Sequence, residues 1–570
     1  MFKINNFQSK RIQSYATIAL VVGILIFINI LAQYFFTTFD LTEEKRFTLS
    51  NPTKSLLKSV DDNVYVRVLL EGEFPAGFKR IQTGTKEMLD DLRGQSSYIN
   101  YTFENPNVGT TEEINNRRKE FKQNGLMPME VTEKGSSETS RKIVFPFALV
   151  TYKGRTEVVD LIENQIPGEN QDVTLNNSMS LLEYKFAQAI KKLKYNSRPN
   201  VLYVEGHGEL NQVQTADLDR TLNKNYEVGR VNLDSVVQLK KDINVLIIAK
   251  PTQAFTEQQK FKLDQYIMNG GRVIWLIDRL TADMDSMSMK GNQTPIDYPL
   301  NLEDQLFKYG ARINPNLVLD LKCAKIPLRT GMQGQAAQLQ NFDWYYQPIA
   351  IPQSQHPTVK SLGEVWFTFP SSIDTIRTKT NVKKTIVLST SDHSREQFVP
   401  VNVNFEILRY PPDPSKFNKK YIPLAVMMEG VFPSLYENRV SSEMNAGMSS
   451  IGLTFQEKSK PTKMLIVSDG DIASSTIDPS NNQPRPLGYN KYMFRAFDNK
   501  NFLLNNIEYL LDDNSLIEAR TRTVKLRMLN KPLVDKESGF WKTLNIALPL
   551  GFLALFGFAY TFWRRKKYTK

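Results

Sequence analysis

The residues best suited to acid–base chemistry or ligand binding form a short motif around a histidine: Glu205, Gly206, His207, Gly208 and Glu209. A histidine flanked by carboxylates can hold and transfer a proton near neutral pH. The motif follows an apolar run and precedes a predicted helix, which is where α/β folds place ligands and nucleophiles. Alternatively, the two glycines permit a tight turn in which the imidazole satisfies backbone groups. Both interpretations, a ligand site and a structural turn, stay open.

A second polar motif, Ser468-Asp-Gly-Asp471, follows the apolar run 463–467. Two carboxylates around a glycine are suited to a divalent cation, but the other ligands of an EF-hand loop are missing. A strand-end turn with capping carboxylates is the favoured interpretation. Asp469 and Asp471 are retained as candidate ligands beside it.

The sequence gives no support for other kinds of catalytic site. His207, His356 and His393 are widely separated and no HExxH motif occurs, so spacing predicts no metal site. Cys323 is the only cysteine, which excludes an internal disulfide and a CxxC redox pair. No GxxxxGK[ST] loop and no GxSxG elbow occurs. We therefore predict no catalytic residue, no cofactor and no hydrolysis of ATP by the P-loop route.

Aromatic residues are concentrated in one part of the sequence: Phe342, Trp344, Tyr345, Tyr346, Trp366 and Phe367. Exposed rings of this kind could stack on sugars or anchor a protein partner. A buried core is an equally good interpretation.

The two polar motifs need a sheet to position them. Strands and helices alternate from residue 196 to residue 320, which predicts a mainly parallel sheet covered on both faces. An apolar strand and a helix within residues 461–515 are predicted to complete that sheet. Residues 321–460 are predicted to be an insertion of mixed strands and loops, and residues 321–360 lack periodicity and are predicted as loop.

A separate α/β domain is predicted at residues 61–195. Its elements follow the order β-α-β-α-β-β, with a turn at Lys153-Gly154 between the last two strands. This is the order of a thioredoxin-like domain. Because the redox cysteines are absent, we expect the scaffold alone.

Each end of the chain carries an apolar segment long enough to cross a bilayer. Residues 15–36 and 544–563 contain no charged residue, and the first spans about 33 Å as a helix. The first is too long for a signal-peptide core and is predicted to be an uncleaved anchor. Small residues on one side of each span are candidates for packing against membrane helices: Ala16, Ala19, Gly23, Ala547, Gly551 and Ala554.

Positive charges flank these segments. The net charge is +12, and removing the three charges of residues 1–36 and the six of residues 542–570 leaves +3. The basicity therefore indicates topology rather than nucleic-acid binding. The positive-inside rule places both tails, residues 1–14 and 564–570, in the cytoplasm. Residues 37–60 and 516–541 become membrane-proximal segments, and the large folded part is expected in the periplasm.

Four strings in this order resemble a known family: DLTEEKRFTLSNPTKSLL after the first anchor, then VLYVEGHGEL, KMLIVSDGD and NFLLNNIEYLLDD. Together they are similar to the auxiliary components of ABC-type transport systems, in particular those associated with bacterial gliding motility. The resemblance covers nearly the full chain. It implies a subunit that works with a separate permease and a separate ATPase. It also implies that the second region has a class I glutamine amidotransferase-like scaffold without the catalytic cysteine.

The expected fold class is therefore α/β, with a thioredoxin-like domain, an amidotransferase-like parallel-sheet domain and one transmembrane helix at each end. The leading hypothesis is a non-catalytic subunit of an ABC transporter complex in the bacterial inner membrane that supports gliding. A cell-surface polysaccharide or a gliding-machinery protein is considered as a further partner. One alternative is a hydrolase of cell-envelope material using His207. The other is a glycan- or peptide-binding module using the aromatic cluster.

Overall fold

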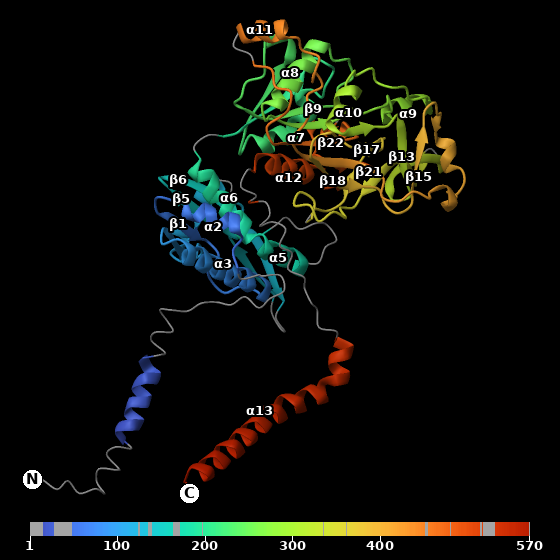
Figure 1. Cartoon of the computed structure of the whole chain (residues 1–570). Helices are drawn as coiled ribbons and strands as arrows, with labels where there is room; N and C mark the ends of the chain where they lie inside the picture. Colours follow the sequence, from blue (N-terminus) through green and yellow to red (C-terminus); the bar gives the residue numbers. More distant parts are fainter. Residues whose placement is uncertain are drawn as a thin grey trace, which may run out of the picture. The chain divides into compact units, whose positions relative to one another are not determined.

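The computed structural model describes most of the 570-residue chain: residues 15–27, 48–123, 126–134, 139–162, 171–195, 198–333, 336–360, 362–450, 454–478, 480, 482–512, 516 and 531–568. The chain divides into two units, residues 1–523 and residues 524–570, which are described separately. Figure 1 shows the elements of both units with their labels.

The first folded region contains a four-stranded mixed sheet with the strand order β2-β1-β5-β6. β1 (Val64–Val68) and β2 (Ile99–Phe103) are parallel, and α3 (Ala76–Gln95) connects them. β5 (Phe147–Tyr152) and β6 (Arg155–Asp160) form an antiparallel hairpin. The other elements of this region are α2 (Asn51–Lys58), α4 (Thr111–Gln123), β3 (Met129–Lys134), β4 (Thr139–Val144), α5 (Gln171–Ser180) and α6 (Leu182–Lys194).

Side-chain alternation explains this sheet. In β1 the three valines are buried, whereas Tyr65 and Arg67 between them are exposed. The valines share a core with Phe78 of α3 and Phe186 of α6. The predicted turn at Lys153-Gly154 joins β5 to β6, and both of its residues have positive φ. The thioredoxin-like assignment stays a prediction, as do the predicted domain boundaries.

The second folded region is built on a seven-stranded sheet with the order β18-β21-β22-β10-β9-β7-β8. Its parallel strands are β7 (Asn200–Glu205), β8 (Glu227–Asn232), β9 (Ile243–Ala249), β10 (Arg272–Leu276) and β22 (Thr462–Val467). β21 (Pro423–Gly430) and β18 (Val382–Ser389) extend the sheet in antiparallel fashion. Taken in chain order, the parallel strands are arranged 2-1-3-4-5. The direction of winding therefore reverses between β7 and β9, the position at which such sheets bind ligands.

Helices cover both faces of this sheet (Figure 1). α7 (Gln212–Leu222) and α12 (Asn499–Leu511) pack on one face, and α8 (Glu257–Met268) and α10 (Glu303–Tyr309) pack on the other. Adjacent residues of β9 contribute to opposite cores, Ile247 to the first and Ile248 to the second. This confirms the predicted parallel sheet with two covered faces, and β22 joins it as predicted. The amidotransferase-like assignment stays a prediction.

Capping residues account for where two of these helices begin. Asn211 and Gln214 form a reciprocal capping box at the start of α7. Thr256 and Gln259 form the same arrangement at the start of α8. Both helices therefore begin shortly after the end of a parallel strand, so the loops that follow β7 and β9 are short.

Residues 321–360, which the sequence predicts as loop, contain two long paired strands instead. β14 (Cys323–Gln333) and β15 (Ala336–Ala350) form an antiparallel hairpin with two register shifts. Gln338, Leu339 and Gln340 are all exposed, so no apolar alternation is visible there. The base of β15 is apolar on both faces. Trp344 and Tyr346 lie in a core that is separate from the two cores on the faces of the seven-stranded sheet.

The smaller elements of the second region complete the fold: η1 (Leu233–Ser235), α9 (Met284–Lys290), β11 (Asn292–Gln293), β12 (Ala311–Ile313), β13 (Asn316–Asp320), β16 (Val365–Trp366), β17 (Ile373–Thr375), β19 (Ser394–Phe398), β20 (Val403–Asn404), η2 (Phe405–Leu408), η3 (Pro414–Lys416), α11 (Ser442–Ser450), η4 (Asp471–Ala473), β23 (Ile477–Asp478), β24 (Gln483–Pro484), β25 (Tyr489–Asn490) and β26 (Arg495–Ala496).

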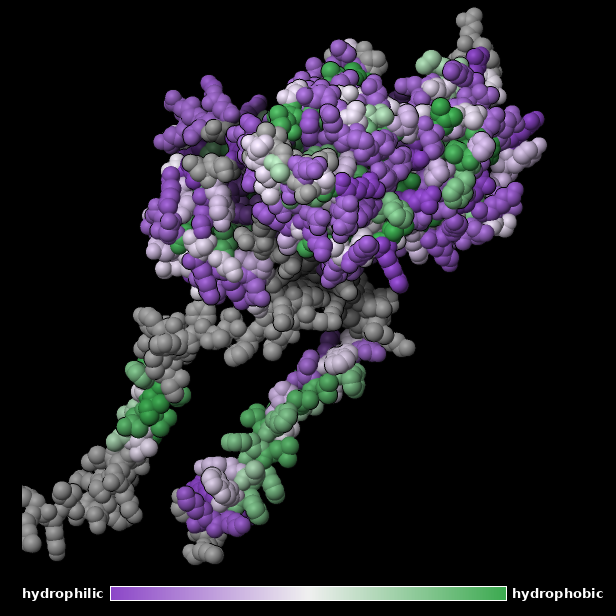
Figure 2. All heavy atoms as spheres, turned by 45° about the horizontal axis from the view of Figure 1, so that its top comes forward, coloured by the Kyte–Doolittle hydropathy of each residue, from purple (hydrophilic) through white to green (hydrophobic). Residues whose placement is uncertain are grey.

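The described part of the second unit is one long helix, α13 (Lys531–Tyr568). Residues 537–567 within it are long and apolar enough to cross a membrane, and their most apolar 18 residues have a mean hydropathy of 1.7. The predicted span 544–563 lies inside this stretch. Figure 2 shows hydrophobic side chains along the middle of α13 and hydrophilic ones at its C-terminal end.

The first predicted span is only partly described. Residues 15–27 form an apolar helix that is shorter than a membrane crossing, and residues 28–36 lie outside the described residues. The predicted tail 1–14, residues 37–47 and residues 517–530 of the predicted return segment also lie outside them. The N-terminal anchor and the packing of its small residues therefore stay predictions.

Candidate functional site

Four polar side chains meet beyond the carboxyl ends of three adjacent parallel strands. Lys250 follows β9, Asp278 comes shortly after β10, and Asp469 and Asp471 follow β22. The Nζ atom of Lys250 lies 3.3 Å from a carboxylate oxygen of Asp278 and 2.5 Å from one of Asp471. Asp278 and Asp469 are buried. Residues almost 200 positions apart therefore form one charged cluster.

Backbone amides hold the two buried carboxylates in place. Asp469 accepts hydrogen bonds from the N–H groups of Thr368, at 2.6 Å, and Asp471, at 2.8 Å. Asp278 accepts one from the N–H group of Gly470 at 2.5 Å. Both carboxylates are thus satisfied by protein groups.

Burial dominates the electrostatics of the cluster. It raises the pKa of Asp278 to about 6, against the opposing effect of the Lys250 ammonium, and it raises the pKa of Asp469 well above its usual range. Burial also acts to lower the pKa of Lys250, but the neighbouring carboxylates outweigh it and the pKa is raised. The lysine therefore stays charged and neutralises part of the negative charge.

The cluster does not have the composition of a metal site. The ammonium group of Lys250 occupies the position between Asp278 and Asp471 where a cation would bind. Among the residues that the structure describes, no group of three or more His, Cys, Asp or Glu side chains could hold a metal ion. The arrangement favours the strand-end turn for Asp469 and Asp471.

The motif around His207 forms a turn at the point where the winding of the sheet reverses. Gly206 and Gly208 have φ values of +117° and +74°, a region that favours glycine. The carbonyl oxygen of His207 accepts hydrogen bonds from the N–H groups of Thr252, at 2.8 Å, and Gln253, at 2.9 Å. The turn therefore joins the loops that follow β7 and β9, at the edge where sheets of this type bind ligands.

The imidazole of His207 is buried in this turn and contacts neighbouring side chains. It is 3% exposed and stacks on Phe255 with 3.7 Å between ring centroids. Its Nδ1 atom lies 3.1 Å from a carboxylate oxygen of Glu209, which is buried as well. Burial acts to lower the pKa of His207, but the Glu209 carboxylate more than offsets it and the pKa is raised. Glu205, the last residue of β7, is exposed. These contacts favour the structural turn.

The aromatic cluster is largely a core. Trp344 and Phe367 are fully buried, and Tyr346 is 2% exposed. The ring of Trp344 packs 5.1 Å from that of Tyr346 and 5.3 Å from that of Phe405, measured between centroids. Rings in these positions cannot stack on a sugar, so the glycan-binding interpretation of this cluster is wrong for them.

A cavity that the sequence analysis missed lies beside α10. Its volume is about 720 Å³, and its lining comes from the segment after β10, from α10, from β12 and from residues 435–439. Four leucines and two isoleucines are part of its lining, together with several charged side chains. Because these segments are scattered over more than 150 positions of the sequence, no local motif could have indicated the cavity.

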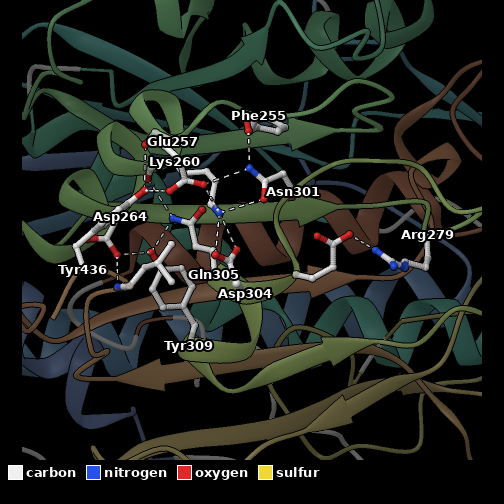
Figure 3. Close-up of polar contacts among 12 residues, drawn as sticks. Phe255, Glu257, Lys260, Asp264, Arg279, Asn301, Asp304, Gln305, Tyr309 and Tyr436 are labelled. Atoms are coloured by element: carbon white, nitrogen blue, oxygen red, sulfur yellow. Dashed lines mark hydrogen bonds and ion pairs between the residues drawn. The ribbon is translucent and has the colours of Figure 1, made fainter. Parts of the chain in front are cut away.

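Two buried polar residues of α8 contact residues that form opposite walls of this cavity, Asp304 on α10 and Leu435 (Figure 3). Lys260 is fully buried, and its Nζ atom lies 2.8 Å from both carboxylate oxygens of Asp304 on α10. Asp264 accepts hydrogen bonds from the hydroxyl of Tyr309, at 2.9 Å, and from the N–H group of Leu435, at 2.8 Å. Burial raises the pKa of Asp264, although these hydrogen bonds act in the opposite direction.

Comparison with known proteins gives a family for the second folded region. A family model described as "ABC-type uncharacterized transport system" matches residues 198–506, more than half of the chain. A model of a domain of unknown function matches residues 43–151. An uncharacterized protein of Borreliella burgdorferi is 24% identical over 455 residues, which cover 77% of this chain and 82% of that protein.

Two solved structures show weak similarity. The N-terminal domain of mmIFT52 aligns with a TM-score of 0.30 and 12% identity, over 55% of this chain and 96% of that chain. A protein described as ThuA-like from Parabacteroides merdae aligns with a TM-score of 0.26 and 10% identity, over 55% of this chain and 89% of that chain. Both scores are too low to carry a conclusion about fold.

Proposed function

Because the chain belongs to the auxiliary-component family described as an ABC-type uncharacterized transport system, we propose that it is a non-catalytic accessory subunit of an ABC transporter. The family match over residues 198–506 is the observation that carries this proposal. The polar clusters at the carboxyl edge of the sheet support it, because His207 and Lys250 make their contacts within the protein.

The proposed partners are a permease in the membrane and a separate ATPase in the cytoplasm, since the sequence contains no P-loop. α13 supports attachment to the membrane because it is long and apolar enough to cross it. We further propose that both termini lie in the cytoplasm, that the folded regions lie in the periplasm, and that the complex supports gliding motility.

Co-purification tests the accessory role. A tagged full-length chain, isolated in mild detergent from its own host, should bring a permease and an ATPase with it. A chain that ends before α13 is the matched control and should lose the permease if the helix contributes to docking. Repeated isolation of the intact chain without either partner would refute the proposal.

The hydrolase alternative is tested at the histidine. His207→Asn keeps a polar group next to Glu209 and removes general acid–base catalysis. We expect normal spreading of cells that express this variant at the wild-type level, and loss of spreading in a strain without the protein. Loss of spreading in the folded His207→Asn strain would instead favour catalysis, and normal spreading of the deletion strain would remove the gliding role.

A further inference from the structure

We propose that the cavity beside α10 binds a small organic anion with an apolar body and a strongly acidic group. Its volume of about 720 Å³ lies in the range of ligand pockets, roughly 300 to 1,000 Å³. The inference concerns this cavity alone and does not depend on the transporter partners or on the membrane topology.

Most charged side chains around the cavity are paired with one another, and two cationic side chains of its lining are not. Arg279 pairs with Asp297 at 2.7 Å and with Glu303, and Lys308 pairs with Glu437 at 2.8 Å. Asp304 pairs with Lys260 at 2.8 Å, and Lys260 also lies 3.1 Å from Glu257.

The two remaining charged side chains of the lining are Arg312 of β12 and Arg439. Both are exposed, and neither guanidinium group has a hydrogen bond or an ion pair with any residue in the part of the chain that the structure describes. A guanidinium group forms paired hydrogen bonds with the oxygens of a phosphate or carboxylate. These two unpaired guanidinium groups therefore favour an anion.

The interior of the cavity is suited to an apolar group. Leu300, Leu302 and Leu435 line it and are almost fully buried. Phe307 also lines it, with 51% of its surface exposed. An inorganic anion would contact the arginines and leave this apolar surface in water, whereas an apolar body attached to the anion would cover it. Charge and surface together favour a molecule that has both parts.

The walls are fixed by buried groups, so binding needs little rearrangement. Lys260 holds Asp304 on one wall, and Asp264 holds Leu435 on the other (Figure 3). Because Lys260 and Asp264 both belong to α8, one helix sets the separation of the two walls. A site that is shaped in advance loses less affinity to the ordering of its own side chains.

Calorimetric titration of the full-length chain in lipid nanodiscs tests the inference, with empty nanodiscs as the blank. The probes are 2-naphthyl phosphate, which has both parts, inorganic phosphate, which has the anion alone, and 2-naphthol, which has the apolar body alone. We expect 2-naphthyl phosphate to bind at least about tenfold more tightly than either of the others.

Arg312→Gln/Arg439→Gln should weaken binding of 2-naphthyl phosphate at least about tenfold, because the two guanidinium groups are removed. Both side chains are exposed, so the variant should keep the wild-type unfolding midpoint. The matched control Arg220→Gln/Lys86→Gln removes the same charge from the exposed surfaces of α7 and α3 and should bind normally. Unchanged affinity in the first variant, equally tight binding of 2-naphthol, or no heat at millimolar 2-naphthyl phosphate would overturn the inference.

Discussion

Lys250 and Asp278 follow adjacent parallel strands and place their charged atoms 3.3 Å apart in the interior of the second folded region. Asp278 also accepts the N–H group of Gly470, which comes after β22. The pair therefore connects the strands encoded before residue 280 to the strand that returns almost 200 residues later. This contact helps to explain how β10 and β22 can be neighbours in the sheet although a long insertion separates them in the sequence.

Replacing Lys250 with Met should lower the free energy of unfolding by about 3 to 5 kcal/mol, because buried carboxylates lose their cation. The measurement is the urea midpoint of the second region, followed by tryptophan fluorescence, since Trp275 is buried in β10. Lys241→Met makes the same chemical change at an exposed position and should have little effect. Lys250→Met/Asp278→Asn should recover part of the loss, and equal midpoints for Lys250→Met and wild type would contradict the role of the pair.

The stability of this region should also depend on the protonation of His356. This side chain is 7% exposed, and burial lowers its pKa to about 4, from 6.5 in the unfolded chain. Between these values the unfolded state binds a proton that the folded state does not. Above pH 6.5 the histidine has no effect, and as the pH falls toward 4 it costs up to about 3 kcal/mol of stability.

His356→Asn should therefore reduce the loss of stability on acidification, and unfolding midpoints at pH 7 and pH 4.5 would measure it. Asparagine can still accept the hydrogen bond that Nδ1 shares with Thr358. Asp278 has the opposite effect, because its raised pKa makes stability fall as the pH rises from about 4 to about 6. The pH dependence of His356→Asn is therefore compared with that of the wild type, in which Asp278 has the same effect.

Gly208→Ala should be destabilising for two reasons. The residue has φ +74°, and a methyl group there would overlap the Oγ1 atom of Thr252. Gly154→Ala is a matched control, because Gly154 has φ +76° with nothing within 4 Å of the added carbon. We expect Gly208→Ala to lower stability by about 1 to 3 kcal/mol more than Gly154→Ala. Equal unfolding midpoints for the two variants would show that the turn can move away from β9.

The sequence predicts the sheet of the second region well because its strands are short apolar runs that alternate with amphipathic helices. The ends of those strands also indicate where polar groups gather, and Asp469 and His207 lie there. Lys250 and Asp278 were missed because each is a single charged residue after an apolar strand. That Lys250 and Asp278 pair with each other can be recognised only when the order of the strands in the sheet is known.

Other features carry no such local signal. In β15, Gln338, Leu339 and Gln340 are exposed in succession, so the sequence lacks the alternation that marks a half-buried strand. The aromatic residues at its base gave equal support to a core and to a binding surface, and burial of Trp344 decides for the core. The cavity beside α10 depends on loops that converge in space, which periodicity cannot show.

The apolar helix α13 gives a final prediction about topology. Leu550 and Leu553 lie near the middle of its apolar stretch and are exposed. Two arginines at these positions should oppose membrane insertion by roughly 5 kcal/mol. A green fluorescent protein fused after Lys570 should therefore fluoresce in the wild type, with its C-terminus in the cytoplasm, and lose most of its signal in Leu550→Arg/Leu553→Arg. Leu339→Arg, on the exposed β14–β15 hairpin, should keep the signal. A dark wild-type fusion would refute the cytoplasmic C-terminus, and a bright double variant would show that α13 does not need its apolar surface for this placement.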